Sequence, residues 1–468
     1  MVGMPGRSKG CRTCRRRQCD RQEPICGQCR KACITCDGYD PPFTIHYYNG
    51  FKEKARSSPE IPDEPPNASY GAASQALSRT AYESGFEDLF WARYLPNGQS
   101  ATLFDLTWRS LGGSINVLRD LLPGSRLLRT AFGALALRAA ARETNAGQAM
   151  KEHGSRLHST ALRQMNKMLG PRSRNGVEAL GAARIFSFYE ALFGDDWECH
   201  AIQYRTWKAH QTGDLAIVLS RDPLVFSTGS AHRLFADGRL HYALNSMRAR
   251  QETVLSQPRW MTEPWIHYSK TPKDLLIDIL LEIPSIYVAI DKMNAEMDPD
   301  TNKLYLADVR SKVLEISQNL VDWEMKFGAS NFITDSDWHF PQRTGTDEIA
   351  VAHVKSIYWA ICILVSDALP TSLAADGCAH QLEPKKCCQN IIHCMPLFLH
   401  PASGIFRQHL IPFPLVTAMS YLVSSDTSGL EDEIEFLVGL YKSPDFSSMR
   451  HFISSLKDGA LLAKSDRV

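Results

Sequence analysis

Apolar residues recur at helical spacing through most of the chain after residue 84. In three separate stretches the large apolar side chains fall on one face of an α-helix. These are Leu128, Phe132, Leu135 and Ala139; Leu276, Ile279, Leu280 and Ile283; and Leu430, Ile434, Leu437 and Tyr441. Alternation of apolar and polar residues, which indicates strands, is scarce. The pattern therefore predicts an all-α body over residues 84–468.

Prolines are expected to separate the helices of this body, because proline lacks the amide hydrogen that a helix interior needs. Pro123, Pro171, Pro272 and Pro284 are the main examples. The longest uninterrupted apolar stretch, Ile357–Val365, is too short to cross a bilayer, so no membrane segment is expected. The body is longer than most single hydrophobic cores accommodate, which allows one large domain or two fused lobes.

Residues 41–83 have a different composition. They contain Pro41-Pro42, Ser57-Ser58-Pro59 and the proline-rich run 61–66, with few large apolar residues after Phe51. Such a segment cannot bury enough apolar surface to fold by itself, so it is expected to be a flexible linker. Its prolines exclude a coiled coil at this position. If the protein forms a homodimer, the helical body must provide the interface.

The basic residues are concentrated at the start of the chain. Residues 1–40 hold nine Lys or Arg and four Asp or Glu, whereas the remainder holds 43 basic and 47 acidic residues. Binding to nucleic acid releases counterions only where cations are clustered. The charge pattern therefore assigns nucleic-acid binding to the first 40 residues and argues against a second such surface in the body.

Seven of the thirteen cysteines lie in the first 36 residues. Six of them have the spacing C-x2-C-x4-C-x6-C-x2-C-x6-C: Cys11, Cys14, Cys19, Cys26, Cys29 and Cys36. Two cysteines separated by two residues can bind one metal ion within a tight turn, and six thiolates suffice for two tetrahedral Zn²⁺ ions that share ligands. Residues 1–9 have no apolar core typical of a secretory signal, so a disulfide framework is disfavoured.

This segment resembles the fungal six-cysteine binuclear zinc cluster, a DNA-binding domain of fungal transcription regulators. The resemblance rests on Gly10–Arg17, Cys19-Asp20, Pro24, Cys26-Gly27-Gln28-Cys29 and Cys36. It implies that Cys11 and Cys26 bridge both zinc ions, that Cys14 and Cys19 complete one site, and that Cys29 and Cys36 complete the other. It also implies that Arg12, Arg15, Arg16, Arg17 and Gln18 contact double-stranded DNA, at half-sites similar to CGG.

One spacing departs from the family. Four residues separate Cys14 from Cys19, where the family usually has six. A helix turns by about 100° per residue, so the loss of two residues reorients the side chains that reach the major groove. Aligned from the left, Gln18 takes the place of the usual base-contacting lysine, and aligned from the right, Arg16 does.

Three explanations of the short spacer are open. They are a tolerated tighter loop, a decayed cluster that no longer binds its DNA site well, and a gene model that lacks two residues. Because a metal-binding loop has little geometric slack, the last two are favoured together. Cys33 lies inside the final spacer and is interpreted as a spare cysteine.

The body resembles the fungal-specific transcription factor domain, a helical regulatory region that often accompanies this cluster. The resemblance is diffuse and rests on aromatic and proline-containing phrases at loose spacing. They are Phe86–Trp91, Leu121-Leu122-Pro123, Phe188-Tyr189-Glu190, Trp207 with His210, Leu234-Phe235, Pro258-Arg259-Trp260, Pro264-Trp265 and Pro412-Phe413-Pro414. It implies regulation and contact with transcription coregulators rather than catalysis.

No motif in the body indicates an enzyme. Asp195-Asp196 invites comparison with the paired aspartates of terpene cyclases, but the further carboxylates that those enzymes need are missing. Cys378, His380, Cys387, Cys388, His393 and Cys394 superficially offer a second metal site. Residues 387–399 are instead expected to form an amphipathic helix with buried thiols. Trp260, Trp265 and Trp323 are expected to fill the core rather than stack on bases.

Together these features predict a nuclear, zinc-dependent, sequence-specific regulator of RNA polymerase II genes. Residues 1–40 would form the zinc-cluster domain, 41–83 the linker and 84–468 the all-α regulatory domain. The alternative is a helical interaction protein or coregulator whose shortened cluster has lost DNA binding.

Overall fold

The computed structural model describes residues 31, 85–96, 113–142, 147–169, 176–194, 200–296, 298–328, 346–368 and 382–465. Of these residues, 88% are helical and none forms a strand, so the predicted all-α body is confirmed. The chain divides into two units, Met1–Asn67 and Ala68–Val468. All the described residues except Lys31 belong to the second unit, which is a single unit rather than two lobes.

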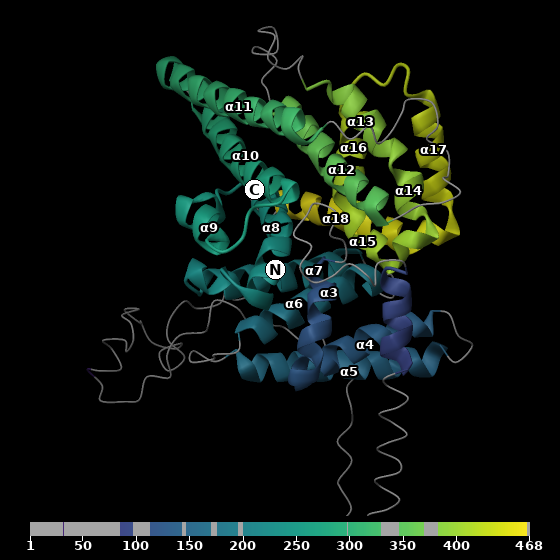
Figure 1. Ribbon diagram of the computed structural model, residues 1–468. Helices are drawn as coiled ribbons and strands as arrows, with labels where there is room; N and C mark the ends of the chain where they lie inside the picture. Colours follow the sequence, from purple (N-terminus) through teal and green to yellow (C-terminus); the bar gives the residue numbers. More distant parts are fainter. Residues whose placement is uncertain are drawn as a thin grey trace, which may run out of the picture. The chain divides into compact units, whose positions relative to one another are not determined.

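The first helices of the body form one end of it (Figure 1). Residues 85–94 are helical and are followed by α3 (Gly113–Leu121), α4 (Arg126–Ala141), α5 (Gly147–Met168) and α6 (Gly176–Phe193). Helix α4 packs along α5 and also contacts α6. The predicted apolar face of α4 is confirmed, because Leu128, Phe132 and Leu135 are fully buried.

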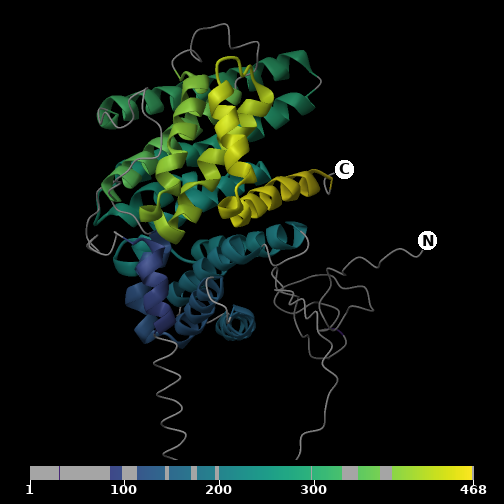
Figure 2. The same ribbon diagram turned by 90° about the vertical axis from the view of Figure 1, so that its right-hand side faces the viewer.

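The middle of the chain supplies four long helices: α7 (His200–Leu219), α8 (Gly229–Ala249), α10 (Pro272–Ala295) and α11 (Pro299–Phe327). Helices α10 and α11 lie side by side and project beyond their neighbours (Figures 1 and 2). Short helical turns join these elements: η3 (Pro223–Phe226), η4 (Val254–Ser256), α9 (Pro258–Thr262) and η5 (Glu263–Trp265).

The last part of the body begins with α12 (Thr346–Asp367), which packs against α10, α11, α13 and α16. Helix α18 returns to pack on α6 and α7, so the end of the described chain contacts its first half. The remaining elements are η1 (Leu122–Gly124), α13 (Pro384–His393), α14 (Met395–Leu399), η8 (Pro401–Phe406), α15 (Arg407–Leu410), α16 (Pro412–Ser424), α17 (Glu431–Lys442), η9 (Pro444–Phe446) and α18 (Ser447–Ser465).

Helix α10 begins where the sequence indicates but does not end where expected. Thr271 and Asp274 form a reciprocal capping box, and Pro272 occupies the first turn, where no amide hydrogen is needed. Pro284 was expected to separate two helices, and this prediction is wrong because the helix continues through it to Ala295. Pro284 is buried between Ile283 and Ile286, so packing of the apolar face outweighs the lost hydrogen bond.

Helix α12 contains the apolar run Ile357–Val365 within a longer apolar helix. Residues 347–367 are long and apolar enough to cross a membrane by length and composition, which the nine-residue run alone did not suggest. However, 78% of the apolar window is buried inside the structure, where Ile357, Ile361 and Val365 have no exposed surface. This burial is typical of the central helix of a helical core.

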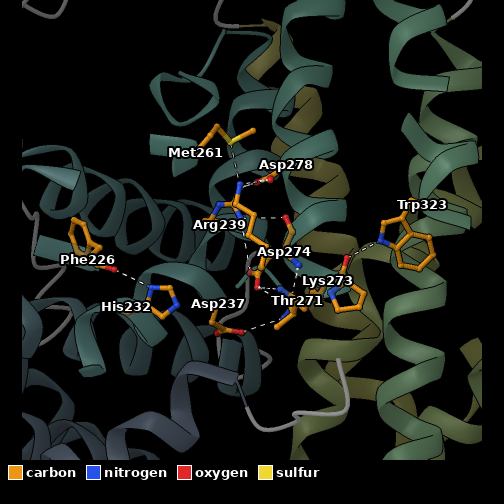
Figure 3. Close-up of polar contacts among 12 residues, drawn as sticks. Phe226, His232, Asp237, Arg239, Met261, Thr271, Lys273, Asp274, Asp278 and Trp323 are labelled. Atoms are coloured by element: carbon orange, nitrogen blue, oxygen red, sulfur yellow. Dashed lines mark hydrogen bonds and ion pairs between the residues drawn. The ribbon is translucent and has the colours of Figure 1, made fainter. Parts of the chain in front are cut away.

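Helix α8 carries charged residues into the interior. The guanidinium of Arg239 is fully buried, forms an ion pair with Asp278, and donates a hydrogen bond to the backbone oxygen of Asp274 at 3.3 Å (Figure 3). It also lies 4.4 Å from the ring centroid of Trp265. Lys270 pairs with the same Asp278. These contacts attach α8 to α10.

Gly238, also on α8, allows a buried arginine of α6 to approach. A Cβ atom at this position would lie only 1.7 Å from Nη2 of Arg184. The arginine cannot move aside without breaking its buried contacts, which are described below. A glycine is therefore required here by the space available.

We expect Gly238→Ala to lower the free energy of unfolding by about 3 kcal/mol or more, because the added methyl group would displace a buried, ion-paired guanidinium. Gly213→Ala in α7 is the matched control, since nothing lies within 4 Å of a Cβ atom there. Alanine favours helix over glycine, so the control should be neutral or stabilising by up to about 1 kcal/mol. Urea denaturation of both variants measures the difference, and equal stability of the two would refute the packing argument.

Candidate functional site

A cavity of about 230 Å³, partly open to solvent, lies where the early helices of the body meet the late ones. Helices α6, α7 and α8 border one side, and α12, α16 and α18 border the other. Much of the wall is apolar, with Trp207, Phe413 and Phe452 among its aromatic residues. Concave, mainly apolar pockets that also carry polar groups are the usual form of small-molecule sites. The cavity is thus the candidate site of the described body.

Three helices meet at a buried polar triangle beside the cavity, which Arg184 lines. Nε of Arg184 (α6) lies 3.1 Å from Oδ2 of Asp214 (α7), and its Nη2 donates to the hydroxyl of Tyr242 (α8) at 2.7 Å. The hydroxyl of Tyr242 donates to Oδ1 of Asp214 at 3.0 Å, which closes the triangle. Burial raises the pKa of Asp214 to about 6, although Arg184 and Tyr242 favour its charged form. The ion pair therefore exists at neutral pH.

A second carboxylate, the half-buried Asp237 of α8, lies beside this triangle. It accepts hydrogen bonds from the amide of Ser114 at 2.7 Å and from the Ser114 hydroxyl, and Lys273 lies 3.4 Å away (Figure 3). Burial alone would raise the pKa of Asp237, but Lys273 and Ser114 outweigh burial and hold the pKa below its usual range. Asp237 therefore stays ionised and ties α8 to α3 and α10.

Two histidines of the wall are uncharged at neutral pH. His409 stacks on Phe188 with ring centroids 4.4 Å apart. The ring centroid of His241 lies 6.5 Å from that of His409. Burial is the main cause that lowers the pKa of His241 to about 3 and that of His409 to about 4. Each ring can thus act as a neutral hydrogen-bond donor or acceptor.

Several polar atoms of the lining residues are buried and have no hydrogen-bond partner among the described residues. They are Arg184 Nη1, Ser187 Oγ, Gln211 Oε1, Arg248 Nη1, Gln408 Oε1 and His409 Nε2. A buried polar group without a partner costs about 1–3 kcal/mol, so native proteins keep few of them. Their concentration around one cavity distinguishes this region from an ordinary core.

A separate group of buried side chains could hold a metal ion. His158, Glu190 and His210 offer one ligand atom each, and these atoms lie within 4.8 Å of one another. Two histidines and a glutamate are ligands that Zn²⁺ accepts. Burial is the main cause that lowers the pKa of His158 to about 3 and that of His210 to about 4, so both rings are neutral as metal binding requires. The positive charge of Arg138 also lowers the pKa of His158, which counts against a cation there.

The late cysteines pack as thiols in the described part of the chain. Sγ of Cys387 donates to the Leu382 carbonyl at 3.1 Å, and Cys388 and Cys394 are fully buried. Nε2 of His393 lies 2.9 Å from Oε1 of Glu433. Burial raises the pKa of Cys388 to about 12, so it holds its proton at neutral pH. The expected burial of the thiols is confirmed for Cys387, Cys388 and Cys394, whereas Cys378 and His380 lie outside the described residues.

Two other expectations for the body can be compared with the structure. Residues 387–399 were expected to form one helix, but α13 ends at His393 and α14 begins at Met395, next to Pro396. Trp260, Trp265 and Trp323 are each less than 9% exposed and fill the core as expected. Asp195 and Asp196 lie outside the described residues.

The zinc-cluster residues also lie outside the described residues. These are the cysteines Cys11, Cys14, Cys19, Cys26, Cys29 and Cys36, and the DNA-contact residues Arg12, Arg15, Arg16, Arg17 and Gln18. The two zinc ions and the double-stranded DNA that they imply therefore remain predictions.

The cavity was not predicted from the sequence. One sequence feature could have indicated a buried polar site in this region. Arg184, in Ala182-Ala183-Arg184-Ile185-Phe186, places a charge in an otherwise apolar helix. A charge in that position must find a buried partner, but the partner, Asp214, lies on another helix.

Breaking the buried pair should be far more costly than breaking an exposed one. We expect Asp214→Asn to lower the free energy of unfolding by about 3–5 kcal/mol, because it leaves the guanidinium of Arg184 buried without a counter-charge. Asp308→Asn breaks a 2.8 Å pair with Lys312 on the partly exposed surface of α11 and should change stability by less than about 0.5 kcal/mol. Chemical denaturation at pH 7 measures both, and comparable losses would contradict the assigned role of the pair.

Acidification should destabilise the body. His158, His210, His241 and His409 have pKa values of about 3 to 4 when folded, below the usual 6.5. Between these values the unfolded state binds more protons, so stability falls as pH decreases, by about 1.4 kcal/mol per pH unit for each histidine. Asp214 opposes this trend. Because its pKa is raised to about 6, below that pH the folded state binds a proton at Asp214 before the unfolded state does.

We therefore expect acid unfolding with a midpoint at about pH 4–6. The measurement is urea denaturation at a series of pH values, followed by far-ultraviolet circular dichroism. His158→Gln should reduce the slope of the free energy of unfolding against pH by about 1.4 kcal/mol per pH unit, the contribution of one histidine. A free energy of unfolding that stays constant from neutral pH to about pH 4 would contradict the burial of neutral histidines.

Comparison with protein families, with curated proteins and with solved structures finds no match to this chain. The function must therefore be argued from the residues of the chain itself.

Proposed function

We propose that the protein is a zinc-dependent, sequence-specific DNA-binding regulator of transcription by RNA polymerase II, acting in the nucleus. The observation that carries this proposal is the spacing of the six cysteines from Cys11 to Cys36 around the run Arg15-Arg16-Arg17. Thiolates at that spacing suit two zinc ions, and arginine pairs bidentately with guanine in the major groove.

The distribution of charge supports this proposal. Residues 1–40 carry a net charge of +5 and the remainder of the chain −4. A DNA-binding protein neutralises phosphates with clustered cations, so the head is the part suited to the duplex. The helical body would then serve regulation.

The packing of the body supports a regulatory rather than a catalytic role. Two charged pairs near the cavity hold helices together, Arg184 with Asp214 and Lys273 with Asp237. The body would contact coregulators and provide the surface for a homodimer. Leu304 and Met325 of α11, each 71% exposed, are apolar residues available for such contacts.

A second candidate function is favoured by the four-residue spacer between Cys14 and Cys19. If the shortened loop cannot close around zinc, the protein would act as a helical coregulator that binds other regulators without reading DNA. Both candidates assign the same role to the body and differ only in the head.

Zinc content and DNA binding of the full-length protein separate the two. We expect two zinc ions per chain and a salt-sensitive gel shift on duplexes that contain CGG, because each phosphate contact releases a counterion. Combined Arg15→Ala, Arg16→Ala and Arg17→Ala should abolish the shift while leaving zinc bound. One zinc ion or none, with no shift, would favour the coregulator.

Matched variants test the ligand assignment. Cys26→Ser should lower the zinc content, since the resemblance gives Cys26 a bridging role, whereas Cys33→Ser should leave two ions bound. Arg156→Ala, on the exposed side of α5, is the control for the arginine variants and should leave DNA binding unchanged. Insertion of two residues between Cys14 and Cys19 shows whether the short spacer limits binding.

A further inference from the structure

The cavity of the body is built for a particular kind of occupant. Its aromatic and aliphatic wall includes Trp207, Met247, Phe413 and Phe452, which suit the apolar part of a small molecule. Polar side chains, among them Gln211, Arg248 and Gln408, lie between these apolar ones. A molecule that fills the cavity must therefore be mainly apolar, with a limited number of polar atoms.

Three charged residues line the cavity: Arg184, which is paired with Asp214, Asp367, which is exposed, and Arg248. Arg248 is the cation among them that favours a negatively charged occupant. It lies on α8 and lines the cavity, and its guanidinium forms no ion pair with any described carboxylate. The buried arginines Arg184 and Arg239 differ in this respect, because Arg184 pairs with Asp214 and Arg239 with Asp278. Burial lowers the pKa of Arg248 and outweighs the opposing effect of Tyr204, in keeping with the absence of an ion pair.

The position of the Arg248 guanidinium is also defined. It lies 5.5 Å from the ring centroid of Trp207, within the range of a cation–π contact, and its Nη1 has no hydrogen-bond partner among the described residues. A guanidinium presents several donors in a planar fork that matches a carboxylate. Arg248 thus offers directed donors as well as charge.

The remaining unpartnered atoms define a second requirement. The side-chain oxygens of Gln211 and Gln408 can only accept hydrogen bonds, whereas Ser187 and His409 can donate or accept. A hydroxyl or amino hydrogen on the occupant would satisfy such an acceptor. Water can form hydrogen bonds with the same atoms, but water cannot supply a negative counter-charge for the Arg248 guanidinium.

We propose that the cavity binds a small organic acid with an apolar body, whose carboxylate pairs with Arg248. A phosphate ester would bring more negative charge than one unpaired guanidinium balances, so the carboxylate is the better fit. Because the late helices α16 and α18 cover the early helices α6, α7 and α8 at this cavity, the bound acid stabilises their contact. This inference deepens the proposed function by naming the class of signal that the body receives, and only its consequence for transcription rests on that function.

Binding of defined acids to the full-length protein tests the proposal. Octanoate, phenylpropanoate and phenyllactate are titrated by calorimetry in the absence of DNA, each beside its primary amide. We expect at least one acid to bind about tenfold or more tightly than its amide, because the charge-assisted hydrogen bonds are lost in the amide. Absence of binding by all three acids, or equal binding by acids and amides, would overturn the proposal.

Variants locate the site. Arg248→Gln should weaken binding of the acid by about tenfold or more while leaving binding of the amide unchanged. Arg250→Gln is the matched control, because Arg250 is near the same end of α8, pairs with Asp291 and does not line the cavity. Acid binding that survives Arg248→Gln would place the acid elsewhere and refute the assignment.

A cavity-filling variant keeps the test decisive if Arg248→Gln does not fold. Ala191 lines the cavity on α6, so Ala191→Leu should weaken binding of both acid and amide. Unchanged acid binding in a folded Ala191→Leu protein counts against the cavity. The gel shift is measured separately on the same proteins, so loss of DNA binding and loss of acid binding are distinguishable outcomes.

Discussion

The arrangement of the body depends on the rule that a buried guanidinium needs a counter-charge. Arg184 and Arg239 are both almost fully buried, and each finds an aspartate on a neighbouring helix. Removing a charge from water costs several kcal/mol, which only close, well-oriented partners compensate. Helices α6, α7, α8 and α10 are therefore held at one relative position, since sliding any of them would separate a buried pair.

Helix α8 is the element at which these requirements converge. Along one helix, Asp237 faces α3 and α10, Arg239 faces α10, and Tyr242 faces α6 and α7. Apolar packing supplies most of the stability of such a body, but apolar contacts tolerate small shifts. The polar contacts of α8 do not tolerate such shifts, because a small displacement would separate their partners. They therefore fix the helices that border the cavity.

How much the sequence could predict follows from how local each feature is. The apolar faces of α4 and α10 were visible because a helix repeats every few residues. The continuation of α10 through Pro284 could not be predicted from the sequence, because it depends on packing by other helices. The Arg184–Asp214 pair joins residues on separate helices, and no local pattern announces such a partner. The zinc-cluster prediction stands on spacing alone, since those cysteines lie outside the described residues.

The buried thiols have a practical consequence for chemistry on this protein. Cys362, Cys387, Cys388 and Cys394 are shielded within the body, and for the last three the pKa is raised, so little of the reactive thiolate forms. Alkylating reagents applied to the folded chain should therefore spare these four. Mass spectrometry of the modified peptides, with and without a chelator, would then register metal occupancy at the cysteines of residues 11–36 with little background from the helices.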